Sequence, residues 1–211
     1  MAETVLRTAD GAEKAALSQV IADRWFAARE AGAALEIGRA SPPARPARPT
    51  KPDLLDPRDV PRRRPGTLKG RLAILHAVAH IELNAIDLHW DIIARFTATP
   101  MPLGFYDDWV KAAAEEAHHF ILVSGVLEAH GSHYGALPAH AGMWRAAEDT
   151  KGDRMVRLAG VPMVLEARGL DVTPGMIELF AKAGDARAVE ALELIYAEEV
   201  GHVAYGSKWF H

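Results

Sequence analysis

Apolar residues recur every three or four positions through most of the chain, a spacing typical of α-helices that bury one face. One such pattern ends at Gly169, and the pair Thr173–Pro174 then marks a new helix start. Nowhere do apolar and polar residues alternate convincingly in the manner of a half-buried strand. The sequence therefore predicts an all-α protein. Its expected helices cover residues 10–34, 67–97, 105–130, 153–169, 174–183 and 187–210.

A different kind of sequence separates the first expected helix from the others. The stretch from Arg39 to Arg71 contains eight prolines and ten Lys or Arg residues against three Asp residues. Proline lacks a backbone donor and disrupts both helix interiors and sheet ladders, so we expect an extended arm on the surface. Its positive charge could serve RNA or another anion, but we favour an arm laid over an acidic face of the chain's own bundle.

The arm divides the chain into two parts. We expect residues 1–66 to form an N-terminal helix plus a Pro- and Arg-rich arm that packs on the bundle, and residues 67–211 to form a four-helix bundle. The N-terminus has no apolar core of signal-peptide length, and no run of about 18 apolar residues would span a membrane. The expected localisation is therefore the cytoplasm, with no membrane partner.

Composition limits the chemistry that the chain can carry. Its 211 residues, 49% of them hydrophobic, suffice for one substantial core. The absence of cysteine excludes disulfides, thiolate zinc sites and cysteine nucleophiles, so any metal must be bound by imidazole and carboxylate. The net charge of −4 gives no general preference for nucleic acid.

Each of the four long helical patterns has a glutamate in the middle of its apolar face. Burying an isolated carboxylate is costly, so four such residues in four helices require a shared explanation. A cluster of that much negative charge is stable only around cations. The four residues are Glu82, Glu116, Glu166 and Glu199.

The spacing of these glutamates repeats. Glu116 follows Glu82 by 34 residues, and Glu199 follows Glu166 by 33. The second glutamate of each pair is also followed by a histidine three residues later, His119 and His202, which lies on the same helix face. Four carboxylates and two imidazoles in a four-helix bundle match the ligands of a di-iron or di-manganese site, with Glu116 and Glu199 central to its chemistry.

The string EEAHH (residues 115–119) offers two Glu-x-x-His pairs, and comparison with EEVGH (residues 198–202) selects one. In the second string only Glu199 has a histidine three residues on, so Glu116 and His119 are the matching pair in the first. Glu115 falls in line with Asp108 and Lys111 on the solvated side, so Glu115 and His118 are expected to face mostly water or the residues around the ligands. We therefore expect a Glu115→Ala variant to retain metal.

Four further residues lie close to this pattern. Glu198 and Asp87 are candidates to accept a hydrogen bond from the second ring nitrogen of a ligand histidine. His89, seven residues after Glu82, could assist in the same way, although a packed or exposed histidine is the more common case. Pro162, one turn before Glu166, is expected to kink its helix.

The strings HIELNAIDL, EEAHHF, VLEARGLDVTP and EEVGHVAYGSKWF resemble the ferritin-like superfamily, specifically the bacterial domain-of-unknown-function family 455. The resemblance covers residues 67–210. It implies a ferritin-like four-helix bundle with a metal bound by Glu82, Glu116, His119, Glu166, Glu199 and His202. Members of that family often continue well past the Trp-Phe string, whereas this chain stops at His211.

The leading functional hypothesis is an O2-dependent oxidoreductase or hydroxylase with two Fe ions, or alternatively Mn or mixed Mn/Fe. It would act on an unidentified small-molecule substrate with an electron donor, as a monomer or dimer. A tRNA-modifying hydroxylase is one version, which the basic arm from Arg39 to Arg71 keeps open. Alternatives are a ferroxidase that stores iron in a cage, as ferritins do, and a non-enzymatic protein with a structural metal.

Overall fold

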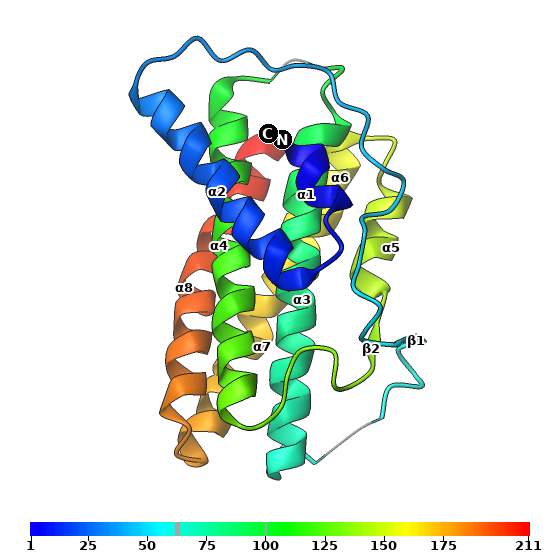
Figure 1. Cartoon of the computed structure of the whole chain (residues 1–211), viewed down its shortest axis with the longest axis vertical. Helices are drawn as coiled ribbons and strands as arrows, with labels where there is room; N and C mark the ends of the chain where they lie inside the picture. Colours follow the sequence, from blue (N-terminus) through cyan, green and yellow to red (C-terminus); the bar gives the residue numbers. More distant parts are fainter. Residues whose placement is uncertain (62–63, 100) are drawn as a thin grey trace.

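The computed structural model describes residues 1–61, 64–99 and 101–211 (Figure 1). Almost all of the regular structure is helical, which confirms the all-α prediction. The two strands, β1 (Leu54–Leu55) and β2 (Ala139–His140), are two residues long and pair in parallel. The helices are α1 (Ala2–Arg7), α2 (Gly11–Glu30), α3 (Leu68–Arg95), α4 (Leu103–Ala129), α5 (Gly142–Asp149), α6 (Arg154–Gly160), η1 (Val161–Glu166), α7 (Ala167–Lys182) and α8 (Ala186–Phe210).

Four helical rods, α3, α4, the α6–η1–α7 run and α8, form the bundle (Figure 1). Helices α3 and α4 run antiparallel, as do α7 and α8. Residues 130–153 carry the chain back from one end of the bundle to the other, so that α4 and α7 run in the same direction. This single long crossover distinguishes the bundle from a simple up-down-up-down arrangement.

Side chains at the helix starts explain several boundaries. The Thr67 hydroxyl accepts a hydrogen bond from the Gly70 amide at the start of α3, and the Asp185 carboxylate accepts one from Ala188 at the start of α8. Such caps satisfy backbone donors that have no partner inside the helix. Gly184, with φ of +71°, turns the chain between α7 and α8 in a conformation that favours glycine.

The third rod differs from its prediction. Instead of ending at Gly169 and restarting after Thr173, helix α7 runs unbroken through Pro174. The Thr173 hydroxyl donates to the Gly169 carbonyl, and α7 packs along α8, so tertiary contact outweighs the local stop signals. Helices α1 and α5 were not predicted. Helix α5 buries only Trp144 and Ala147, too few positions to produce a clear period.

Pro162 has a defined structural effect. It lies at the start of the π-helical segment η1, which ends at Glu166, and η1 continues directly into α7. A proline removes one helical hydrogen bond, and a π-helical turn absorbs that loss with a wider ring. The predicted local distortion is therefore present as a π-helical turn. It places Glu166 at the junction between two kinds of helix.

The proline-rich arm is extended and lies along the bundle (Figure 1). Its backbone accepts hydrogen bonds from Lys14 at Ala47 and from Arg95 at Pro43. Two of its arginines have side-chain partners on helices: Arg45 pairs with Glu148 of α5, and Arg48 donates to Asn84 of α3. The expected contact with the bundle is thus present, although only part of it is with acidic side chains. Arg62 and Arg63 lie outside the described residues.

Within the described part of the chain, no helix is both long enough and apolar enough to cross a membrane.

Candidate metal centre

The structure brings all six predicted ligand residues together in the middle of the bundle. Each is at most 9% exposed, and each comes from the rod that the sequence assigned to it. The residues are Glu82 on α3, Glu116 and His119 on α4, Glu166 at the end of η1, and Glu199 and His202 on α8.

Glu116 lies between the two histidines. Its Oε2 is 3.4 Å from Nδ1 of His119, and its Oε1 is 3.1 Å from Nδ1 of His202. The other carboxylates flank this axis. Oε2 of Glu82 is 3.5 Å from Nδ1 of His119, and Oε2 of Glu199 is 3.6 Å from Nδ1 of His202. One carboxylate therefore spans two adjacent groups of donor atoms.

A second pair of glutamates crosses between α4 and α8. Oε2 of Glu198 is 2.7 Å from Nε2 of His119, and Oε2 of Glu115 is 3.0 Å from Nε2 of His202. A carboxylate can only accept, so Nε2 of each ring carries the hydrogen in both bonds. The rings are thereby fixed with Nδ1 toward the centre.

This arrangement tests the expectations for the neighbouring residues. Glu198 accepts from His119, one of the predicted ligands, as expected. Asp87 does not: its carboxylate pairs with Lys14 at 2.5 Å, on the side of α3 that meets α2 and the arm. Of the two positions expected for Glu115, in water or around the ligands, the structure shows the second. The Glu115 side chain is 18% exposed and contacts both Lys111 and His202, because α8 packs over that edge of α4.

Burial shifts the ionisation of the carboxylates strongly. It raises the pKa of Glu82 and Glu166 well above the usual value, and the nearby charges of Glu116 and Glu199 act in the same direction. The pKa of Glu199 is also raised by burial. For Glu116, burial alone would raise the pKa, but hydrogen bonds with His119, His202 and His89 outweigh it and lower the pKa well below the usual value.

The two ligand histidines shift in the opposite direction from most buried imidazoles. Burial would lower the pKa of each ring, but hydrogen bonds to carboxylates outweigh this effect. Glu116 and Glu198 are the partners of His119, and Glu115 and Glu116 are the partners of His202. Both pKa values are therefore raised well above normal. Without a cation the cluster retains protons, and these protons must leave when a metal binds.

Several buried polar atoms at the centre make no hydrogen bond within the described residues. They include Oε2 of Glu82, both carboxylate oxygens of Glu166 and Oε2 of Glu199. Unsatisfied buried carboxylate oxygens are rare in folded proteins and destabilise them. Metal ions would satisfy all of these atoms at once. Oxygen and imidazole donors suit Fe and Mn, so the residues present fit such ions.

His89 has a larger role at this centre than its sequence position indicated. It is 1% exposed, and its Nε2 is 3.4 Å from Oε1 of Glu116 and 3.5 Å from Oε1 of Glu166. Burial lowers its pKa, so the ring is neutral. A signal was available, because position 89 lies seven residues, about two helical turns, after Glu82 and so on the same face.

The donor atoms form overlapping groups in which every atom is within 4.8 Å of the others. Glu116 belongs to two of the groups, and Glu199 and His202 also belong to two each. The groups are Glu82–Glu116–His119–Glu199, His89–Glu116–His202 and Glu166–Glu199–His202. These buried acidic and histidine groups are compatible with metal binding.

Comparisons with known proteins confirm the family named in the resemblance. The family described as "Protein of unknown function (DUF455)" matches residues 7–211. An uncharacterized protein of Haemophilus influenzae is 46% identical over 166 residues, which cover 76% of this chain and 58% of the relative. The chain thus spans less than two thirds of that relative's length. No solved structure matches the chain. The match over nearly all of the sequence shows that the chain belongs to the DUF455 family.

Proposed function

We propose that this protein is a di-metal carboxylate protein of the ferritin-like type, which binds two iron ions and catalyses an O2-dependent oxidation of a small organic substrate. Manganese, or one ion of each metal, would suit the same donors. One observation carries the proposal: four buried carboxylates and two imidazoles from four helical rods converge with unsatisfied donor atoms facing one another.

The charge balance of the cluster supports this interpretation. An alternative to a metal centre is four unrelated buried glutamates, each neutralised by an arginine. Among the described residues, the basic side chains within 4 Å of these glutamate oxygens are histidines, and none is a lysine or an arginine. The negative charge of these glutamates is therefore not balanced by lysine or arginine side chains, which leaves that task to bound metal ions. The single long crossover between α4 and α7 is also the connection found in ferritin-like bundles.

When bound, two reduced iron ions at such a site supply the activation of O2. The chain contributes position, proton control and exclusion of water. Glu116 presents one oxygen to each side of the centre, while Glu115 and Glu198 fix the imidazole rings. Buried apolar residues one turn from the ligands, such as Ile86, Ala112 and Ile195, keep the surroundings dry.

The hypothesis of an RNA substrate gains no specific support from the arm. Three of the ten basic side chains that prompted it have acidic partners within the chain: Arg45 with Glu148, Lys51 with Asp53 and Arg58 with Asp56. Iron storage would use the same ligands, but it requires a multi-subunit cage. Size-exclusion chromatography distinguishes an oxidase from an iron-storage protein, because we expect the first to be a monomer or dimer and the second to be a large particle.

Metal content is the first experiment. Protein purified after growth with added iron should contain about two Fe or Mn ions per chain, measured by inductively coupled plasma mass spectrometry. Glu199→Ala should lose metal, whereas Glu193→Ala, an exposed glutamate on the same helix, should not. A metal content near zero in the wild-type protein would contradict the proposal.

Catalysis is tested separately on the metal-loaded protein. After chemical reduction, the wild-type protein should consume O2 faster than Glu199→Ala does, and mass spectrometry of small molecules that co-purify with the protein should identify the class of substrate. If the metal-loaded wild-type protein consumes O2 no faster than Glu199→Ala, the protein binds metal but does not catalyse the proposed oxidation.

A further inference from the structure

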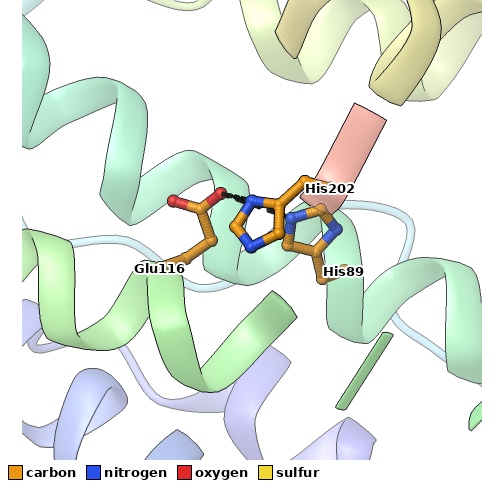
Figure 2. A group of neighbouring side chains, drawn as sticks. All are labelled: His89, Glu116 and His202. Atoms are coloured by element: carbon orange, nitrogen blue, oxygen red, sulfur yellow. Dashed lines mark hydrogen bonds and ion pairs between the residues drawn. The ribbon is translucent and has the colours of Figure 1, made fainter. Parts of the chain in front are cut away.

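Figure 2 shows the side chains of His89, Glu116 and His202 converging from α3, α4 and α8. The resemblance to ferritin-like proteins implies one metal ligand on α3, Glu82. In this chain α3 presents a second donor two turns later. The imidazole of His89 approaches Oε1 of Glu116, whereas His119 approaches Oε2, and it lies next to the unsatisfied carboxylate of Glu166.

The distances fit ligands of one ion. Two atoms that each lie about 2.1 Å from an ion, at an angle of roughly 90–110°, are about 3.0–3.4 Å apart. Nε2 of His89 is 3.4 Å from Oε1 of Glu116, and Nδ1 of His202 is 3.1 Å from the same oxygen. These three atoms can therefore surround a common ion with only small movements.

An ordinary packing role does not account for this position. His89 stacks on Trp109, with ring centroids 5.3 Å apart, and that contact orients the ring so that Nε2 points at two carboxylates. A residue needed only to fill the space beside Trp109 would be apolar, because a buried polar ring requires a partner. The second carboxylate, that of Glu166, has no hydrogen bond of its own among the described residues.

We propose that His89 is an additional protein ligand, so that one metal position has two imidazole nitrogens and the other has one. The inference rests on the proposed di-metal function. The first position takes donors from Glu82, Glu116 and His119, and the second from His89, Glu116, Glu166 and His202, with Glu199 within reach of both. The two positions are then chemically unequal.

This inequality has a consequence for metal choice. Imidazole donors suit Fe better than Mn, whereas carboxylate and water suit Mn. The position that contains His89 should therefore prefer Fe(II), and the position that contains His119 should discriminate less. Protein loaded with equal amounts of Fe(II) and Mn(II) without oxygen should place Fe at the His89 position first.

The test compares His89→Gln with two references in metal titrations without oxygen. The wild-type protein should bind two Fe(II) ions. His89→Gln should weaken one of the two by tenfold or more, leave the other unchanged and lose the preference for Fe(II) over Mn(II). His80→Gln is the matched control. It is a buried histidine on the same helix, whose ring contacts Tyr134 and the His140 carbonyl rather than the centre, and it should bind both ions normally.

The outcomes separate this inference from the proposed function. If the wild-type protein binds no metal, the di-metal function itself fails. If the wild-type protein binds two ions and His89→Gln binds both with unchanged affinity and selectivity, the function stands and the role of His89 is wrong.

A measurement on the unaltered protein covers the case in which His89→Gln does not fold. In Co(II)-loaded wild-type protein with ¹⁵N-labelled histidine, NMR should show strongly shifted ring N–H signals from three metal-bound histidines: His89, His119 and His202. Two such signals, from His119 and His202 alone, would overturn the proposal.

Discussion

At the scale of single residues, the centre depends on pairs of neighbouring glutamates with different tasks. In both EEAHH and EEVGH the second glutamate faces the centre, and the first reaches across to the histidine of the other helix. Helical spacing identifies Glu116 and Glu199, because the positions of apolar residues along a single helix show which of its side chains face the core. It cannot identify the acceptor role of Glu115, which depends on how closely α8 approaches α4.

The acceptor residues give the first prediction. Glu198→Ala should lower metal affinity by about 10- to 100-fold, because His119 would lose the bond that fixes its ring and tautomer. Glu115→Ala should also weaken binding, through His202, which replaces the expectation from sequence that it would have no effect. Isothermal titration calorimetry with the metal measures the change in affinity of both variants.

The control for this prediction is Glu128→Ala, which removes an exposed carboxylate from α4. Its metal affinity should equal that of the wild-type protein. If Glu198→Ala binds metal as tightly as Glu128→Ala, the cross-helix hydrogen bonds do not position the ligands.

At the scale of secondary-structure elements, the π-helical segment η1 depends on a close contact with α8. A Cβ atom at Gly206 would lie 2.7 Å from Cβ of Pro162 and 3.2 Å from Cγ of Met163. Only glycine allows α8 to approach η1 this closely. Because Glu166 ends η1, this contact also sets the position of a ligand.

Gly206→Ala should therefore destabilise the protein by about 1–3 kcal/mol and weaken metal binding, because η1 must move away from α8. Gly201→Ala, on the same helix, is the matched control. Its Cβ would meet nothing closer than 3.9 Å, and it should stabilise the helix by about 0.5–1 kcal/mol. Urea unfolding measures both. Equal stabilities of the two variants would contradict the packing argument.

The N-terminal elements are attached through a buried charge pair. Lys14 of α2 and Asp87 of α3 are each 1% exposed, and the Lys14 ammonium also donates to the Ala47 carbonyl in the arm. Burial lowers the pKa of Lys14 and raises that of Asp87 to about 6. One side chain thus joins α2, α3 and the arm at a single point.

Lys14→Met should lower the free energy of unfolding by roughly 3 kcal/mol, because it leaves the Asp87 carboxylate buried without this partner. The arm should also become easier to cut in limited proteolysis, since Ala47 loses its donor. Lys182→Met removes a lysine that is 77% exposed and paired on the surface, and it should change stability by less than about 1 kcal/mol. Similar losses in the two variants would refute the anchoring role.

At the scale of the whole molecule, the centre makes stability depend on pH in opposite ways with and without metal. The folded pKa values of Glu82, Glu166, Glu199, His119 and His202 are all raised. Without metal, the folded state therefore retains more protons than the unfolded state between the ordinary and the raised pKa values. In that window stability falls as pH rises.

Glu116, His80, His89 and Asp87 also have shifted pKa values, but these groups change the stability of the protein below about pH 7. Glu116, with its lowered pKa, contributes stability that is lost only at acid pH. Burial lowers the pKa of His80 to about 4 and also lowers that of His89, so their effects end near the ordinary histidine value of 6.5. The contribution of Asp87 is lost as pH rises through about 6. Above about pH 7 the raised groups of the centre lower stability as pH rises, whereas Lys14, with its lowered pKa, acts in the opposite direction between its folded and ordinary values.

We therefore expect the free energy of unfolding in chelator to fall between about pH 7 and pH 8.5, by about 1.4 kcal/mol per pH unit for each extra proton held in the folded state. Metal affinity should rise over the same range, because the ions replace those protons. Urea unfolding with EDTA and with Mn(II) measures both. A flat profile in EDTA, or the same slope in Glu166→Gln as in wild type, would contradict this account.

The sequence by itself determined the helical class, the long helices of the bundle and the six residues that meet at its centre. These features follow from the period of the apolar face and from the i, i+3 spacing, which act within one helix. Only the tertiary structure decided the unbroken helix through Pro174, the cross-helix bond of Glu115 to His202, and the position of His89 beside Glu166. Those features depend on the distance and rotation between packed helices, which no spacing along a single helix encodes.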